Sequence, residues 1–583
     1  MFLKKVTIRR SEKVYNYYKI VTSYRDKDGK PKHRVVQNLG ALSDEDANRM
    51  RLIIKSQQDS DLVLAKSSDV VVTKHWLYLP VMVLHTLWKK LELHRFFSNS
   101  ILAEALVLNR CIKPLSKINV VDWMHSTVLP SLYDDDILPD NFAIYRELDH
   151  LNAHETDLQT HIYNQLASLD QSIGEAMFYD ITSTYMEGSK CVISKFGYSR
   201  DHRQDREQVV IALLVTPEGS PFYWKVLDGN TQDITTLPWL IEELKERFSL
   251  KTCHMVFDRG MVSKDHLDLL EDKKMTYLSA MDKNEMACHP LFERVMPKAV
   301  TPDNYKQRLT LQNFEPIENK RFFIREEKEG KRRYIFSFEV SRFYEDIESR
   351  ENRIKQAFTW MEAENATLSE AKKSRKAETT VRKVQKMLSK KKLKAFMNVS
   401  VIPIELEVLK KDGKTRTVHS FRVCAEVDPE KEKEVRKRDG ITCFITNETS
   451  LDKEEVVFKY RAKNKIEEAF REMKSQLALR PVYLTRPERV KAHVSVCVLA
   501  YLLRNTIELL MQKSNQDMTA SNALQKLESC QLNEVGLKDQ KGKSITATEM
   551  TKEQRQITEW LDATKEIKQT SIKKIVEKLK KSM

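Results

Sequence analysis

Residues 460 to 474 contain four side chains with chemical capacity at regular spacing. In a helix, Tyr460, Lys463, Glu467 and Lys474 would lie within an arc of about 60°. An apolar stripe runs beside this arc, formed by Ile466, Phe470, Met473 and Leu477. A carboxylate can bind a divalent metal and the cations can bind phosphates, so this face indicates phosphodiester chemistry on nucleic acid. A solvated helix with i,i+4 Lys–Glu pairs is the alternative.

Two aspartates in apolar strands are candidates for the same chemistry. Asp180 lies inside the apolar run 176–184, and Asp258 ends the run 252–257. A carboxylate inside such a strand is costly unless it is paired or binds a metal. Each acid alone is typical of a turn, a cap or a salt bridge. Together with Glu467 they give three acids from separate elements, as two-metal phosphodiester chemistry requires, and oxygen ligands suit Mg²⁺ or Mn²⁺.

The elements that must position these acids follow one another in a recognisable order. Strands are predicted at 176–184, 208–215, 221–227, 252–257 and 275–281, with helices at 235–248 and from Ser263. Three strands followed by helix, strand, helix and strand suit a mixed sheet with helices on its faces. We therefore expect the α/β class.

With this unit included, the sequence predicts six regions. We expect a β-hairpin region at 1–70, a helical and possibly DNA-binding region at 71–170, a first part of a catalytic core at 171–284, a β-rich insertion domain at 285–444, a second part of the core at 445–512 and a helical C-terminal region at 513–583. The hairpin is predicted at 14–39. A basic amphipathic segment, 567–583, is expected either to pair with a partner helix or to dock on its own chain.

One stretch of the insertion is strongly basic. Residues 371–394 carry eleven Lys or Arg and one Glu, with apolar residues too sparse for a wide core face. We interpret it as a helical arm that binds phosphates, with a solvated helix as the alternative.

Composition limits the class of protein. The chain has 583 residues, a net charge of +15 and 41% hydrophobic residues, which predicts a packed core and polyanionic partners. The eight cysteines form no C-x-x-C pair, so neither a zinc site of that type nor a disulfide framework is indicated. The N-terminus lacks a signal peptide, and the apolar run 494–503 is too short to span a bilayer. We expect a soluble cytoplasmic protein, associated with the bacterial nucleoid.

The ordered acids resemble the DDE transposases of bacterial insertion sequences, in particular the subgroup with a β-rich insertion before the Glu. The third motif of that group is Tyr, two residues, Arg, three residues, Glu, six residues, Lys. This chain matches at Tyr460, Glu467 and Lys474, and Lys463 stands where the motif has Arg. Lysine keeps the charge but lacks the planar bidentate grip of arginine on phosphate. The segments around Asp180 and Asp258 resemble the first two acidic motifs, and 198–205 and 228–233 resemble further family segments.

The resemblance implies a ribonuclease-H-like mixed sheet and a defined chemistry. Asp180, Asp258 and Glu467 would bind two Mg²⁺ ions, and Tyr460, Lys463 and Lys474 would hold the phosphate near the cut. Water would free a 3′-hydroxyl at the end of the element, and that hydroxyl would attack DNA, in this subgroup through a DNA hairpin. Two protomers would pair the terminal inverted repeats in one synaptic complex with target DNA. The alternatives are a ribonuclease-H-like nuclease without strand transfer and a catalytically inactive DNA-binding or architectural protein.

Overall fold

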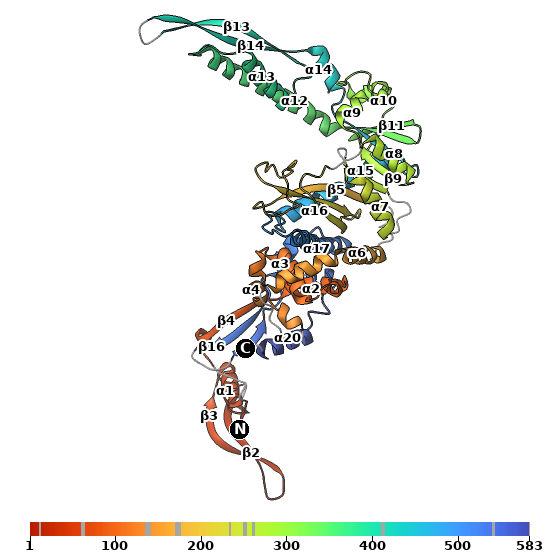
Figure 1. Cartoon of the computed structure of the whole chain (residues 1–583). Helices are drawn as coiled ribbons and strands as arrows, with labels where there is room; N and C mark the ends of the chain where they lie inside the picture. Colours follow the sequence, from red (N-terminus) through yellow and green to blue (C-terminus); the bar gives the residue numbers. More distant parts are fainter. Residues whose placement is uncertain are drawn as a thin grey trace.

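The molecule is elongated, with a projecting arm at one end and a small N-terminal sheet at the other (Figure 1). This computed structural model describes residues 1–10, 13–59, 65–133, 142–169, 176–232, 235–248, 254–258, 263–409, 414–538 and 543–581. The central sheet and the helices beneath it lie between the two ends.

The N-terminal sheet is antiparallel and is covered by one helix. Its elements are β1 (Phe2–Arg10), β2 (Lys13–Arg25), β3 (Pro31–Ala41) and α1 (Asp44–Ser56). Gly29, at φ +76°, lies in the turn between β2 and β3, a left-handed conformation that glycine adopts without strain. The hairpin predicted at 14–39 is confirmed, and β1 adds a third strand. Tyr18, Ala47 and Ile54 belong to a small core that is separate from the main one.

A bundle of helices packs around one long apolar helix, α17 (Pro487–Lys513). Its helices are α2 (Leu79–Lys90), α3 (Ser100–Ile112), α4 (Val120–His125), α5 (Ala143–Ala153) and α6 (Glu155–Leu169), with short 3₁₀ turns at Ser67–Asp69, Leu93–Phe96, Lys117–Asn119 and Leu129–Leu132. Within the described residues α17 alone is long and apolar enough to cross a membrane. However, 78% of its most apolar window is buried inside the protein, so it serves as a core helix.

A nine-stranded mixed sheet forms the middle of the molecule, in the order β10-β11-β12-β15-β9-β8-β5-β6-β7. The strands expected at the sequence level are β5 (Ala176–Tyr185), β6 (Gln208–Val215), β7 (Pro221–Leu227), β8 (His254–Phe257) and β9 (Thr276–Ala280). Strands β5, β8 and β9 are parallel to one another, and β6 is antiparallel to both of its neighbours, β5 and β7. Every residue of β6 is buried, because the sheet is covered on both faces. The predicted mixed α/β class is confirmed.

The helices of this unit begin near the predicted positions. They are α7 (Leu237–Phe248) and α8 (Lys264–Asp272). The Ser263 hydroxyl accepts a hydrogen bond from the backbone N–H of His266, so Ser263 is the N-cap that the sequence indicates.

The sheet continues into the range expected as an insertion. The added elements are α9 (Lys283–Cys288), α10 (Pro290–Val295), α11 (Tyr305–Leu311), β10 (Glu315–Ile317), β11 (Phe322–Glu329), β12 (Arg332–Glu339) and β15 (Ile441–Thr446). Strand β15 pairs with β9 on one side and with β12 on the other. The first strands of the insertion therefore extend the central sheet, and the part that projects is 340–439 (Figure 1).

The projecting arm consists of two helices lying along a long β-hairpin. Its elements are α12 (Val340–Ser369), α13 (Ala377–Lys390), β13 (Met397–Leu409), β14 (Thr415–Val427) and α14 (Pro429–Arg436). Val384, Met387 and Leu388 give α13 one narrow apolar face, which is buried in a core that belongs to the arm alone. Lys383, Lys386 and Lys390 therefore lie on the exposed sides of α13, and the other lysines of 371–394 flank the helix.

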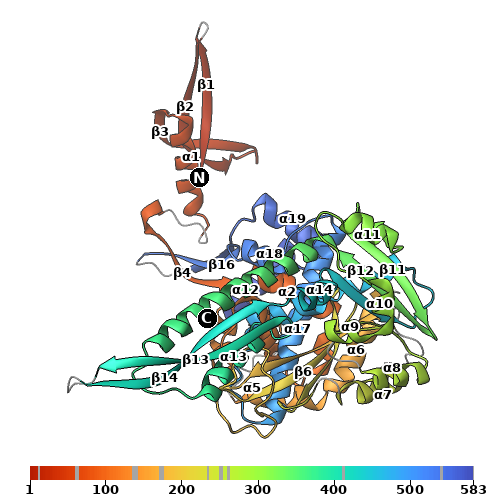
Figure 2. The same ribbon diagram turned by 90° about the horizontal axis from the view of Figure 1, so that it is seen from above.

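The C-terminal region differs from the all-helical prediction. It contains α18 (Ala520–Leu527), β16 (Gln531–Leu537), β17 (Lys543–Ala547), α19 (Lys552–Trp560) and α20 (Gln569–Lys581). Strand β16 lies between β17 and the distant β4 (Val70–Leu77), and Figure 2 shows β4 beside β16. The prediction missed these strands because their partner lies about 460 residues away. Helix α20 docks on its own chain, where Ile575 and Leu579 are buried and the Lys578 ammonium donates to the Tyr133 carbonyl at 3.0 Å.

Candidate functional site

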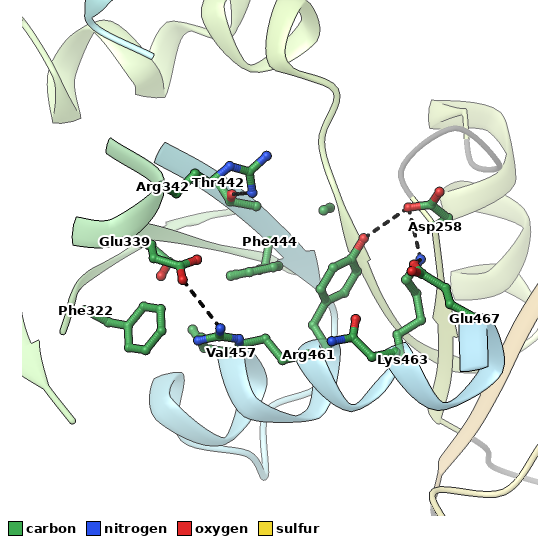
Figure 3. A pocket seen from close by; sticks show the side chains of 14 residues that line it. Asp258, Phe322, Glu339, Arg342, Thr442, Phe444, Val457, Arg461, Lys463 and Glu467 are labelled. Atoms are coloured by element: carbon green, nitrogen blue, oxygen red, sulfur yellow. Dashed lines mark hydrogen bonds and ion pairs between the residues drawn. The ribbon is translucent and has the colours of Figure 1, made fainter. Parts of the chain in front are cut away.

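A pocket of about 280 Å³ lies where the central sheet meets two short helices, α15 (Lys453–Ala462) and α16 (Asn464–Ser475). Its lining residues are Asp258, Ala280, Phe322, Ser337, Glu339, Arg342, Thr442, Phe444, Val457, Tyr460, Arg461, Lys463, Asn464 and Glu467. Figure 3 shows the carboxylates of Asp258 and Glu467 on either side of the Lys463 ammonium. Four of the six candidate site residues therefore line this pocket, namely Asp258, Tyr460, Lys463 and Glu467.

Lys463 links two of the three candidate acids. Its ammonium lies 2.9 Å from Glu467 Oε1 and 3.3 Å from Asp258 Oδ1. The Tyr460 hydroxyl donates to the same Asp258 oxygen at 3.4 Å. The Lys463 side chain is only 6% exposed, whereas those of Asp258 and Glu467 are 44% and 57% exposed. A buried cation therefore faces two carboxylates that are open to solvent.

Asp180 does not line the pocket but lies beside it, on the strand next to the one that Asp258 follows. Strands β5 and β8 are parallel, and their last paired residues are Tyr179 and Phe257. Asp180 and Asp258 are the next residue of each strand, so they lie at one level on strands that are about 4.8 Å apart. Burial raises the pKa of Asp180 to about 6, against the opposing effects of Lys463 and of the Ile181 N–H, which donates to Asp180 Oδ1 at 2.8 Å.

The electrostatics of Lys463 confirm that it interacts with all three acids. Burial alone would lower the pKa of Lys463, but the charges of Asp258 and Asp180 and the hydrogen bond to Glu467 raise it above its usual value. Lys463 is therefore an ammonium ion at neutral pH. Its position explains how one side chain offsets the repulsion among three carboxylates.

The predicted single helix through 460–474 is wrong in one detail. The chain forms two helices, and Lys463 lies at the junction between α15 and α16. Its backbone N–H donates to the Tyr460 carbonyl at 3.1 Å, which is a turn contact rather than an α-helical one. Tyr460 and Glu467 consequently approach the pocket from different helices. Ile466, Phe470 and Met473 are buried as the apolar stripe predicts.

Lys474 lies apart from the other three residues of the motif. Its ammonium contacts Asp201 Oδ1 at 2.8 Å, and the same oxygen accepts a hydrogen bond from Arg480. The Asp201 side chain is 1% exposed, and burial lowers the pKa of Lys474 in spite of this pair. Lys474 lies on α16, seven residues after Glu467, and its side chain binds the 198–205 segment rather than lining the pocket.

Two arginines that the sequence analysis did not single out also line the pocket. The Arg461 guanidinium stacks 4.3 Å from the centre of the Phe322 ring and lies 3.5 Å from Glu339. Arg342, at the start of α12, donates to the Thr442 hydroxyl at 3.1 Å. No sequence signal places Arg342 here, because it reaches the pocket only through the pairing of β12 with β15.

The donor chemistry of the three acids fits a divalent metal. Asp180, Asp258 and Glu467 offer only carboxylate oxygens, the ligands that Mg²⁺ and Mn²⁺ prefer. In the described part of the chain, however, no three Asp, Glu, His or Cys side chains already lie at metal-binding spacing. The contacts of Lys463 with Asp258 and Glu467 occupy the space between the acids.

Comparison with known protein families gives two matches. The family model described as the transposase DDE domain matches residues 174–503, and that described as the N-terminal domain of IS1634 family transposases matches residues 3–63. The first match spans all three candidate acids and the arm. No curated protein matches the chain.

Proposed function

We propose that this chain, which belongs to the DDE transposases of insertion sequences, cuts DNA at the ends of its element and joins those ends to a target. DNA is accordingly its substrate. The observation that supports the catalytic assignment is the shared position of the three acids. Asp180 and Asp258 leave adjacent parallel strands at one level, and Asp258 and Glu467 both contact Lys463.

The strand order supports a ribonuclease-H-like core. Five strands follow one another across the sheet as β7-β6-β5-β8-β9. In chain order this is third, second, first, fourth and fifth, with the second strand antiparallel to the first. Asp180 then lies on the first strand and Asp258 follows the fourth. We propose this arrangement as the catalytic core, with the arm 340–439 inserted before the helix that bears Glu467.

In this proposal, the three acids hold the metal ions and the neighbouring cations hold the phosphate. A bound pair of Mg²⁺ ions, or of Mn²⁺ in their place, would activate the attacking oxygen and stabilise the leaving oxygen. Tyr460 and Lys463 would orient the phosphate, and metal binding by Asp258 and Glu467 would require Lys463 to give up its contacts with them. Lys474 would reach a phosphate only by leaving its ion pair with Asp201.

The reaction would proceed in two steps. Water attacks the phosphodiester at the end of the element, the bond to the 3′-oxygen breaks, and a free 3′-hydroxyl results. That hydroxyl then attacks a second phosphodiester, forms a new bond and releases another 3′-hydroxyl. Attack on the opposite strand would form a DNA hairpin, which a further hydrolysis would have to open to regenerate the 3′-hydroxyl, and attack of that hydroxyl on the target would complete transposition. We propose that two protomers hold the two inverted repeats during these steps.

Mutation of each acid tests the assignment. Asp180→Ala, Asp258→Ala and Glu467→Ala should each reduce Mg²⁺-dependent nicking of element-end DNA by about 100-fold or more, since each removes a metal ligand. Glu468→Ala is the matched control, because Glu468 is an exposed neighbour on α16 that pairs with Lys465 at 3.5 Å. Its nicking rate should remain near that of the wild type. Equal nicking by all the variants would refute the three-acid site.

Strand transfer distinguishes the proposal from its alternatives. A labelled, pre-cut element end should become covalently joined to a second DNA in the presence of Mg²⁺ and the wild-type protein. Nicking without joining would indicate a nuclease. Tight DNA binding without nicking would indicate an architectural protein.

A further inference from the structure

A second, larger cavity lies at the base of the arm and is lined mainly by cations. Its volume is about 960 Å³. We call it the basic groove. Its lining residues are Asp282, Lys283, Asn284, Arg342, Asp346, Ser349, Arg350, Arg353, Ser389, Lys390, Lys391, Lys392, Lys394, Ala395, Phe396, Val435, Arg438 and Asp439. Nine of these side chains are Lys or Arg and three are Asp, so the groove carries an excess of six positive charges.

Two of the three acids of the groove are already in ion pairs, and the third, Asp282, caps α9 by accepting a hydrogen bond from the Asn284 N–H. Asp346 contacts the Lys283 ammonium at 2.8 Å, and Asp439 contacts the Arg350 guanidinium at 2.8 Å. In contrast, none of the described carboxylates lies within ion-pair distance of Lys390, Lys392 or Lys394, and all three side chains are exposed. The uncompensated charge is therefore concentrated in the turn that follows α13.

That turn has a fixed shape. Lys392 adopts a left-handed conformation, with φ at +55°, and the backbone N–H of Leu393 donates to the Leu388 carbonyl at 2.9 Å. This is the pattern of a Schellman helix end. Leu393 and Phe396 are fully buried in the arm core and anchor the segment. Three lysine side chains are thus presented from a rigid turn, which reduces the ordering that binding would otherwise require.

The basic groove borders the candidate catalytic pocket. Arg342 lines both cavities, at the point where α12 leaves the central sheet. A polyanion seated in the groove would pass Arg342 and reach the pocket that contains Asp258 and Glu467. An extended chain of phosphates matches this continuous cationic path, because each phosphodiester carries one charge.

We propose that the basic groove binds the phosphodiester backbone of the DNA next to the bond that is cut. This inference rests on the proposed function for the identity of the substrate. It restricts the phosphate-binding role, expected for the whole stretch 371–394, to the turn 390–394 and its partners across the groove. Because the contacts are with the backbone, they act equally on any DNA sequence.

Two triple variants of the same arm test the proposal. Lys390→Gln/Lys392→Gln/Lys394→Gln removes the groove charges. Lys372→Gln/Lys373→Gln/Lys376→Gln removes three exposed lysines before α13, none of which lines the groove. Both variants change the net charge equally and alter no buried residue. Circular dichroism confirms that each is folded.

Affinity is measured by fluorescence anisotropy with a labelled DNA duplex, in EDTA and over a range of salt concentrations. The groove variant should bind at least about 10-fold more weakly at low salt, and the slope of log K against log salt should fall by about 2 to 3, since each phosphate contact contributes about 0.9. The control variant should keep the wild-type slope. An unchanged slope for the groove variant, or an equal loss for both variants, would overturn the proposal.

The assay separates this inference from the proposed function, because binding in EDTA does not require cutting. Wild-type nicking with unchanged DNA binding by the groove variant would refute the groove alone. Loss of binding by the groove variant in a chain that never cuts DNA would refute the catalytic assignment alone.

Discussion

Asp180 combines burial with a position beside two other charged groups. Its pKa of about 6 lies above the usual value near 3.8 because burial disfavours the carboxylate, and the Lys463 charge offsets this effect only in part. A carboxyl whose pKa is higher in the folded state stabilises the fold at low pH. That contribution is lost as the pH rises from about 4 through about 6. Metal-free protein should therefore be strained at this residue near neutral pH.

The variant Asp180→Asn tests this strain. In EDTA at pH 8 it should unfold at a higher temperature than the wild type. Its free energy of unfolding should be higher by about 1–3 kcal/mol, since one pKa unit corresponds to about 1.4 kcal/mol. At pH 4 the wild-type carboxyl is largely protonated, and the difference should nearly vanish. Thermal unfolding followed by circular dichroism at several pH values measures the stability difference between variant and wild type at pH 8 and at pH 4. A variant that is destabilised at pH 8 would contradict the raised pKa.

A second aspartate, whose pKa is shifted in the opposite direction, provides a control. Asp205 is exposed, and its hydrogen bond with Arg203 lowers its pKa to about 2. Asp205→Asn should therefore bring no gain at pH 8 and a small loss at most, because exposed ion pairs are weak. Stabilisation by both variants would point to a general effect of reduced charge instead.

At the scale of residues, the sequence predicted which side chains share the pocket better than it predicted the ion pairs that they form. The spacing of Tyr460, Lys463 and Glu467 was enough to predict that they meet at one pocket. It was not enough to place Lys474, because the ion pair with Asp201 depends on a loop almost 300 residues earlier in the chain. A helical projection describes neighbours on one helix and contains no information on contacts from other elements.

Among the elements, the arm returns to the central sheet through a closely packed junction at Gly440. Gly440 precedes β15 with φ at +70°, and its N–H donates to Asp346 at 3.0 Å. A Cβ at this position would lie 2.8 Å from Phe343 Cβ and 3.0 Å from the Glu339 carbonyl oxygen. The junction therefore requires glycine for two separate reasons, conformation and space.

Two glycine substitutions separate these reasons. Gly330→Ala should cost only the left-handed backbone term, about 1–2 kcal/mol, because its φ is +60° and nothing lies within 4 Å of the added Cβ. Gly440→Ala should cost about 1–3 kcal/mol more through overpacking. Its thermal midpoint should be several degrees below that of Gly330→Ala in parallel scans. Equal midpoints would show that the junction relaxes around the added methyl group.

The positions of strands could be predicted from the sequence, but which strands pair in the sheet could not. The runs that form β6 and β7 were predicted at their observed positions, since local alternation and turn residues mark them. No local pattern indicates that β15 pairs with β9, so the first strands of the insertion were not expected to extend the core sheet. Likewise, the short turn at Lys463 leaves a helical pattern on both sides and cannot be seen in periodicity.

On the scale of the whole molecule, the residues that the structure describes form three separate hydrophobic cores. The N-terminal sheet and the arm each have their own, and the central sheet shares one core with the helical bundle and the C-terminal region. Because β4 pairs with β16, the two ends of the large unit are joined in one sheet. Local sequence patterns do not indicate this connection; they predict only a helical region at 513–583.

Two truncations follow from this division. Deletion of residues 1–58 removes only the N-terminal sheet and α1, so the remaining protein should stay soluble and unfold within a few degrees of the full chain.

Deletion of residues 516–583 removes Leu527, Leu532 and Ile557 from the shared core and leaves Trp76 without its cover from β16. Each of these buried side chains contributes about 1.5–3 kcal/mol, so their combined loss is comparable with the whole stability of a typical domain, about 5–15 kcal/mol. The second truncation should therefore aggregate on expression, as measured by its soluble fraction and by gel filtration. A soluble, monodisperse product from it would show that the C-terminal sheet is an independent unit rather than part of the core that supports the catalytic pocket.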